Sequence, residues 1–140
     1  MIEKSPFQQV FMPLKQGVIN NHIHVSVRLK PLAENEIQYQ KARGGPQWHI
    51  VNGHTLVDRA GREQYHFDRV FSAEMTTEAI FYDDIEPMIH NALKGYNVTI
   101  LAYGQTSSGK THTISGNTQS PGLISLAANS LFSGLEYLVS

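Results

Sequence analysis

Cysteine is absent from this chain of 140 residues, so neither a disulfide framework nor a thiolate metal site can form. Charged side chains are scarce as well, at 16% of the residues, and the formal net charge is −1 without any run of lysines or arginines. We therefore expect no nucleic-acid partner and no polyanion-binding face. No apolar stretch approaches the length of a membrane span, and the first residues lack the apolar core of a signal peptide. These absences predict a soluble intracellular domain with no membrane partner.

The most informative feature that is present is a complete G-x-x-x-x-G-K-[ST] string at residues 104–111. In this motif the glycines let the backbone turn tightly and direct its N–H groups at a β-phosphate. The lysine reaches the β- and γ-phosphates, the threonine hydroxyl ligates Mg²⁺, and the following helix adds the positive end of its dipole. The candidate nucleotide-binding residues of this loop are Gly104, Gln105, Thr106, Ser107, Ser108, Gly109, Lys110 and Thr111, with Thr111 as the Mg²⁺ ligand.

The neighbourhood of this loop supports the motif. Residues 98–103 form a short apolar and partly β-branched run, which predicts a buried parallel strand immediately before the loop. Residues 110–114 can begin a helix. Because strand, glycine loop and helix occur in the required order, we disfavour the alternative of a Gly/Ser-rich surface turn that happens to carry a lysine.

Upstream of the loop the pattern is mostly that of β-strands. Residues 23–29 alternate apolar and polar side chains, which predicts a strand that ends at Pro31, and the polar residues 33–46 are predicted to form a loop. Residues 48–57 predict a hairpin around Asn52-Gly53. After a second turn at residues 58–64, β character resumes at residues 65–67.

Two helices are predicted in the second half of the chain. The first has a broad apolar face over residues 80–93, a cap at Thr76 or Thr77, an end at Gly95 and a kink at Pro87. The second extends over about residues 123–138. Residues 1–20 have no clear period and are predicted to be a poorly ordered leader, whereas residues 21–140 are predicted to form one α/β unit.

Two other kinds of site are not favoured. The seven histidines are scattered, and although His22 and His24 share one strand face, no carboxylate lies near them at ligand spacing. Asp83, Asp84 and Glu86 are placed on or beside the polar face of the predicted helix. We therefore interpret these histidines and carboxylates as solvated side chains rather than as a metal site or a catalytic carboxylate pair.

Several segments resemble the kinesin motor domain. Residues 102–113 are similar to the phosphate loop of that family almost letter for letter, and residues 95–97 resemble its GYN tripeptide. Residues 65–71 resemble its F-x-F-D-x-V-F segment, and residues 27–32 resemble its first strand, V-R-x-R-P-L. The resemblance extends over residues 22 to about 135, and two further segments, residues 78–81 and 121–127, are similar to the centromere-associated subfamily.

The resemblance implies a P-loop NTPase type three-layer α/β domain with a central, mostly parallel sheet. It also implies ATP and Mg²⁺ as cofactors, microtubules as partner, and a place in the cytoplasm on the cytoskeleton, including the spindle or kinetochore. The adenine would lie near Arg28, Lys30, Pro31 and Tyr96, with His112 beside it. Aromatic, proline and guanidinium surfaces suit a flat base. From the residues alone, Tyr96 as a core residue and Arg28 as a solvated strand residue are the simpler interpretation, and only the resemblance reverses that preference.

The phosphate loop by itself binds a nucleotide but does not hydrolyse it, because hydrolysis also needs a group that positions water and a second anchor for Mg²⁺. In kinesins these come from the switch segments N-x-x-S-S-R-S-H and D-x-A-G-x-E, which we expect to lie beyond residue 140, together with the microtubule-binding elements. The domain is therefore predicted to be incomplete at its C-terminus, and this chain alone is not expected to hydrolyse ATP. The alternatives are a nucleotide-binding or scaffold protein without motor activity, and an unrelated P-loop kinase or GTPase.

Overall fold

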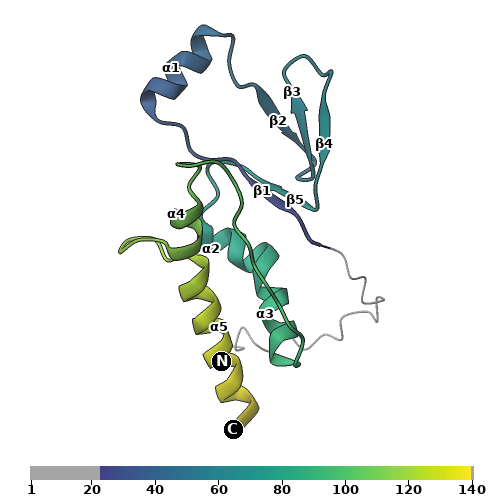
Figure 1. Cartoon of the computed structure of the whole chain (residues 1–140), viewed down its shortest axis with the longest axis vertical. Helices are drawn as coiled ribbons and strands as arrows, with labels where there is room; N and C mark the ends of the chain where they lie inside the picture. Colours follow the sequence, from purple (N-terminus) through teal and green to yellow (C-terminus); the bar gives the residue numbers. More distant parts are fainter. Residues whose placement is uncertain (1–22, 140) are drawn as a thin grey trace, which may run out of the picture.

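The computed structural model describes residues 23–139 and shows a mixed α/β chain with two small sheets above a group of helices (Figure 1). The leader predicted for residues 1–20 and His22 lie outside the described residues. A π-helical turn, Phe81–Ile85, joins α2 to α3. The other elements are β1 (Ser26–Arg28), α1 (Glu34–Ala42), β2 (Trp48–Val51), β3 (Thr55–Asp58), β4 (Gln64–His66), β5 (Arg69–Phe71), α2 (Thr77–Ile80), α3 (Glu86–Leu93), α4 (Lys110–Ser115) and α5 (Leu123–Val139).

The strands form one parallel pair and one antiparallel sheet. β1 pairs with β5 in parallel, with Val27 opposite Val70, and the strand is shorter than the predicted range of residues 23–29. β2, β3 and β4 form a three-stranded antiparallel sheet in that order. The hairpin predicted between β2 and β3 is confirmed, because Asn52 and Gly53 have φ angles of 55° and 68°, the positive values that a tight hairpin turn requires.

The predicted loop over residues 33–46 is wrong, because most of it is helix α1. This helix buries none of its residues, so it has no apolar stripe by which the sequence pattern could reveal it. The interactions that favour this helix are instead a local hydrogen bond at its start and a charge near its end. The Glu36 carboxylate accepts a hydrogen bond from the Ala33 N–H at 2.8 Å, and Lys41 lies in the last turn beside the negative end of the helix dipole.

In this structure residues 98–103 do not form the buried strand that their sequence predicts. The segment is extended but has no strand partner among the described residues, and Leu101 keeps 86% of its surface exposed. Figure 1 shows it as an unpaired trace that leads from the end of α3 to α4. A strand satisfies its backbone groups only through neighbours, and the described parallel sheet has only the two strands β1 and β5. An apolar sequence therefore does not suffice to form a strand here.

The predicted helix over residues 77–93 is confirmed, with an irregular turn in its middle. The Thr76 hydroxyl accepts a hydrogen bond from the Ala79 N–H at 3.1 Å, as a cap should, and Gly95 follows the end of the helix with a φ of 93°. Pro87 lies in the first turn of α3, directly after the π-helical residues. Because proline has no N–H to donate, the regular hydrogen-bond ladder is broken there, and the helix widens before the proline.

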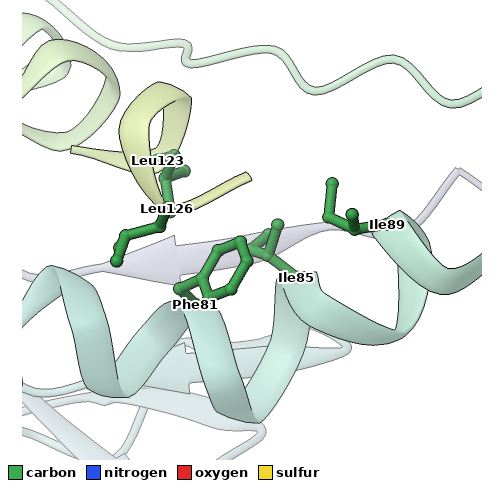
Figure 2. Packing of buried hydrophobic residues seen from close by; sticks show 5 residues of the cluster. All are labelled: Phe81, Ile85, Ile89, Leu123 and Leu126. Atoms are coloured by element: carbon green, nitrogen blue, oxygen red, sulfur yellow. The ribbon is translucent and has the colours of Figure 1, made fainter. Parts of the chain in front are cut away.

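The core lies between this helix and α5, the last helix, whose predicted range is confirmed. Figure 2 shows Phe81, Ile85 and Ile89 from one side meeting Leu123 and Leu126 from α5. All five side chains are buried. Burial of such side chains is the main favourable term in folding, so the packing of these two helices contributes most to the stability of this part of the chain. Ile114 of α4 also packs against this cluster.

Asp84 is buried, so its interpretation as a solvated charge is wrong. Its carboxylate accepts a hydrogen bond from the Ser26 hydroxyl at 2.5 Å and lies 2.8 Å from His24 Nε2. A buried carboxylate needs such partners, and these connect the helix to β1 and to the residues before it. The neighbouring Asp83 behaves as predicted, since it stays partly exposed and forms an ion pair with Arg69.

Candidate nucleotide-binding site

The phosphate-loop string forms a tight loop between the extended residues 98–103 and α4. Gly104 and Gly109 have φ angles of 156° and 94°, and a Cβ atom at Gly104 would lie 2.6 Å from the Ser108 hydroxyl. Both glycines are therefore required by the backbone path, as the motif predicts. Ser107 holds a φ of 65°, a conformation that non-glycine residues seldom adopt and that is concentrated at ligand-binding loops.

The two residues after Gly109 begin helix α4, so the loop ends at the positive end of a short helix. The Lys110 ammonium group donates hydrogen bonds to the carbonyls of Gly104 and Gln105, at 2.8 and 2.7 Å. Its side chain therefore curves back over the loop that it follows. Thr111 is exposed in the first turn of the helix, where its hydroxyl is accessible.

An open cleft of about 640 Å³ lies against this loop and brings most of the predicted site residues together. This volume is within the usual range of small-molecule sites. Arg28, Lys30 and Pro31 line the cleft from the end of β1, opposite the loop. From the loop and α4 the predicted site residues that line the cleft are Gly104, Ser108, Gly109, Lys110 and His112. Thr113 and Ile114 of α4 line it as well.

Some predicted site residues do not line this cleft. Four exposed residues of the same loop and first helical turn are not among the residues that line it: Gln105, Thr106, Ser107 and Thr111. Tyr96 follows the end of α3 and has 52% of its surface exposed. The structure thus brings three of the four predicted adenine residues to the phosphate loop and leaves Tyr96 apart from them.

Arg28 is the most constrained side chain of the site. Its guanidinium group donates to the hydroxyls of Thr77 and Thr113, at 2.9 and 3.0 Å, and to the Met75 carbonyl at 3.1 Å. Partial burial lowers the pKa of this guanidinium group. Arg28 is therefore no solvated strand residue. No sequence signal pointed to Thr77 or Thr113, which lie 49 and 85 residues from their partner.

Lys30, the other cation of the β1 end, is more loosely held than Arg28. Its ammonium group lies 3.5 Å from both carboxylate oxygens of Glu36, on the first turn of α1. Both side chains are solvent-exposed, so the ion pair contributes little stability. An ammonium group also lacks the flat face that a guanidinium group presents to a base, so Lys30 can supply charge but not stacking.

The residues present fit a bound phosphate group. The glycines leave the backbone of the loop open to close approach, and a lysine and a threonine follow where the motif needs them. Elsewhere in residues 23–139, no group of three or more histidine and acidic side chains could hold a metal ion. That the Thr111 hydroxyl ligates Mg²⁺ stays a prediction.

A literal match to D-x-A-G-x-E does occur in the chain, at residues 58–63, so the expectation that this string lies only beyond residue 140 is wrong. In the structure the string is the turn between β3 and β4. The Asp58 carboxylate accepts the N–H groups of Arg62 and Glu63 at 2.6 and 3.0 Å, and the bond from Glu63 above all lowers the pKa of Asp58. Asp58 does not line the cleft, so this string stabilises a turn and is no second Mg²⁺ anchor.

Residues 28–138 match the sequence model of the family described as kinesin motor domain. The chain belongs to this kinesin family. It is 42% identical over 116 residues to the kinesin-like protein KIN-7K, chloroplastic, of Oryza sativa subsp. japonica, an alignment that covers 81% of the chain and 11% of that protein. It is 37% identical over 126 residues to kinesin-related protein 7 of Dictyostelium discoideum, which covers 89% of the chain and 10% of that protein. The chain thus spans about a tenth of the length of these curated relatives.

The kinesin match confirms the family resemblance of the sequence and favours part of a motor domain over an unrelated P-loop kinase or GTPase. The matched region contains the phosphate loop, β5 and the end of β1. Likeness to the centromere-associated subfamily stays a prediction. Among the helices that the structure describes, none has the length and apolar character to cross a bilayer.

Proposed function

We propose that this chain is the nucleotide-binding part of an ATP-driven microtubule motor. The observation that carries the proposal is the loop at residues 104–111, which has positive φ angles at Gly104, Ser107 and Gly109 and borders a cleft that Arg28 and Pro31 also line. Membership of the kinesin motor-domain family supplies the reason to connect nucleotide binding with microtubules. The cytoplasmic cytoskeleton is the corresponding location, with the spindle or kinetochore as a more specific one.

The nucleotide in this proposal is Mg-ATP. Residues 104–109 would hold the phosphates through backbone N–H groups, Lys110 would contact the phosphates, and the Thr111 hydroxyl would ligate Mg²⁺. The adenine would lie on the side of the cleft formed by Arg28, Lys30 and Pro31, next to His112. Tyr96 would be the remaining adenine contact. Bound ATP supplies the phosphoanhydride bond whose cleavage drives a motor.

The residues of this chain provide binding but not the whole hydrolytic site. After the phosphate loop, the chain contains neither N-x-x-S-S-R-S-H nor a D-x-A-G-x-E string. In this proposal, residues outside 1–140 supply the group that positions water and the second Mg²⁺ anchor. Residues 1–140 alone are expected to bind Mg-ATP weakly and to show no microtubule-stimulated turnover.

Turnover by the full-length protein tests the proposal most directly. ATP hydrolysis stimulated by microtubules should fall at least a hundredfold in Lys110→Ala, because the variant lacks the cation that contacts the phosphates. Lys94→Ala removes an exposed lysine just beyond α3 and should leave the rate unchanged. Turnover that survives Lys110→Ala, or that microtubules do not stimulate, would overturn the proposed function.

The same proposal implies a three-layer P-loop domain in which residues 98–103 join a larger parallel sheet. Their extended backbone, their β-branched residues and the exposed Leu101 support this, since all three suit a strand that lacks its neighbours. Hydrogen–deuterium exchange is the test. Amides of residues 98–103 should exchange fast in the isolated 140-residue chain and at least tenfold more slowly in the full-length protein. Equally fast exchange in both would contradict the three-layer fold.

A further inference from the structure

Arg28 is held from three sides by groups outside the phosphate-loop motif. Its two terminal nitrogens donate to the hydroxyls of Thr77 and Thr113 and to the Met75 carbonyl. Thr77 is buried at the start of α2, whereas Thr113 lies on α4, three residues after Lys110. Hydrogen bonds in the plane of a guanidinium group fix the orientation of that plane and leave its two faces free.

The bond to Thr113 also connects β1 to the helix that follows the phosphate loop. Helix α4 has only six residues, buries none of them and has no side-chain hydrogen bond at its N-terminal cap. Ile114 packs this helix against the core, and the bond between Arg28 and Thr113 joins it to β1. The contact of 3.0 Å between Arg28 and Thr113 sets how far the guanidinium face lies from the loop.

We propose that Thr113, assisted by Thr77, is a positioning residue that orients the guanidinium face of Arg28 toward the base of the nucleotide at the phosphate loop. This inference rests on the proposed nucleotide binding and adds two hydroxyl groups that the motif does not contain. In the structure both hydroxyls accept hydrogen bonds from the arginine, and Thr113 also lines the cleft. The part of the affinity that depends on the base is therefore set by Thr113, and the part that depends on the phosphates is set by Lys110 and the loop.

Calorimetric titration of the full-length protein with Mg-ATP and with Mg-tripolyphosphate separates the two parts. Thr113→Val keeps the shape of the side chain and removes its hydroxyl, so it should weaken Mg-ATP binding about three- to tenfold, the usual effect of one lost hydrogen bond. Binding of Mg-tripolyphosphate, which has no base, should stay within about twofold. Thr113→Ser keeps the hydroxyl and should restore Mg-ATP affinity, and Thr118→Val, at an exposed threonine beyond α4, should change neither.

Each other outcome overturns the inference. An equal loss of affinity for both ligands in Thr113→Val would mean that the hydroxyl supports the phosphate loop and not the base. Unchanged Mg-ATP affinity in both Thr113→Val and Thr77→Val would mean that Arg28 needs no positioning. Failure of the unaltered protein to bind Mg-ATP would overturn the proposed function itself, a result distinct from the first two because they require that binding.

Discussion

Residues 77–93 and residues 98–103 are both rich in apolar side chains, yet they have opposite fates in the structure. The first segment is helical and places Phe81, with 1% of its surface exposed, in the core against α5. The second is extended and unpaired within the described part of the chain, and its Leu101 is 86% exposed. The two segments are separated by only a few residues around Gly95.

The difference teaches which structures a partial domain can form by itself. A helix satisfies its backbone groups within its own sequence and needs one apolar surface to pack on, which α5 provides. A central parallel strand needs a neighbour on each side, and parallel neighbours come from distant parts of a chain. The helical segment is therefore complete within these residues, and the strand segment is not.

The largest effect should come from truncating one apolar side chain in each segment. Phe81→Ala empties a buried position and should lower the free energy of unfolding by about 3–5 kcal/mol. Leu101→Ala, the matched truncation in the other segment, should change it by less than about 0.5 kcal/mol, because the side chain is already in water. Urea denaturation of residues 1–140 measures both. A large loss in Leu101→Ala would show that Leu101 is packed in solution, as Ile100 of the same segment already is against the core, and the contrast between the segments would disappear.

The next effect concerns the polar contact that joins the helical segment to β1. Asp84→Ala removes a buried carboxylate together with its part-buried hydrogen bond from the Ser26 hydroxyl, and it should lower the free energy of unfolding by about 1–3 kcal/mol. Asp83, which directly precedes Asp84, forms a half-exposed ion pair with Arg69. Asp83→Ala breaks this pair and should lower the free energy of unfolding by at most about 1 kcal/mol. Thermal unfolding of the two variants side by side makes the comparison. If Asp83→Ala were the more harmful, the helix would be tied to the sheet by its surface and not by Asp84.

How far the sequence predicts this structure depends on how local each signal is. The phosphate loop, the hairpin at Asn52-Gly53 and α5 were predictable because backbone requirements or an apolar period lie within a short stretch. The contact of Asp84 with Ser26 was not, since the two residues are 58 positions apart and an aspartate on a helix usually faces water. The same holds for Thr113 as partner of Arg28.

The differences between prediction and structure also arise where the deciding contacts are not visible in a short stretch of sequence. Residues 98–103 have the composition of a buried strand, but composition cannot tell whether neighbouring strands are present. Helix α1 has no apolar face, so its formation depends on a capping carboxylate and on charges near its ends. The string at residues 58–63 shows the converse, since a motif outside its structural setting acts as an ordinary turn.

A smaller effect should appear where strands do find partners locally. Gly53 in the β2–β3 turn has a φ of 68°, and nothing lies near enough to obstruct a side chain there. The cost of Gly53→Ala is therefore only that of holding an alanine in the left-handed backbone conformation, and the variant should lower the free energy of unfolding by about 1 kcal/mol. Gly53→Asn should cost less, because asparagine tolerates this conformation. Amide exchange at Ile50 and Leu56 follows the hairpin, and equal exchange in both variants would mean that the turn does not limit pairing.

The smallest effect belongs to α1, which is formed by local contacts without burial. The hydrogen bond from the Ala33 N–H, above all, holds the pKa of Glu36 below its ordinary value. A carboxylate with a lowered pKa in the folded state stabilises that state above the ordinary carboxyl pKa, and the contribution is lost as the pH falls through the folded pKa. The protection factors of the amides of residues 34–42, which measure the slowing of exchange corrected for the intrinsic effect of pH, should thus fall in acid and, at neutral pH, in Glu36→Gln. Glu34→Gln, also in the first turn, should have less effect, because the Glu34 carboxylate does not cap the helix. Equal effects of the two variants would mean that Glu36 stabilises α1 only through its charge near the helix dipole and not through the hydrogen bond to Ala33.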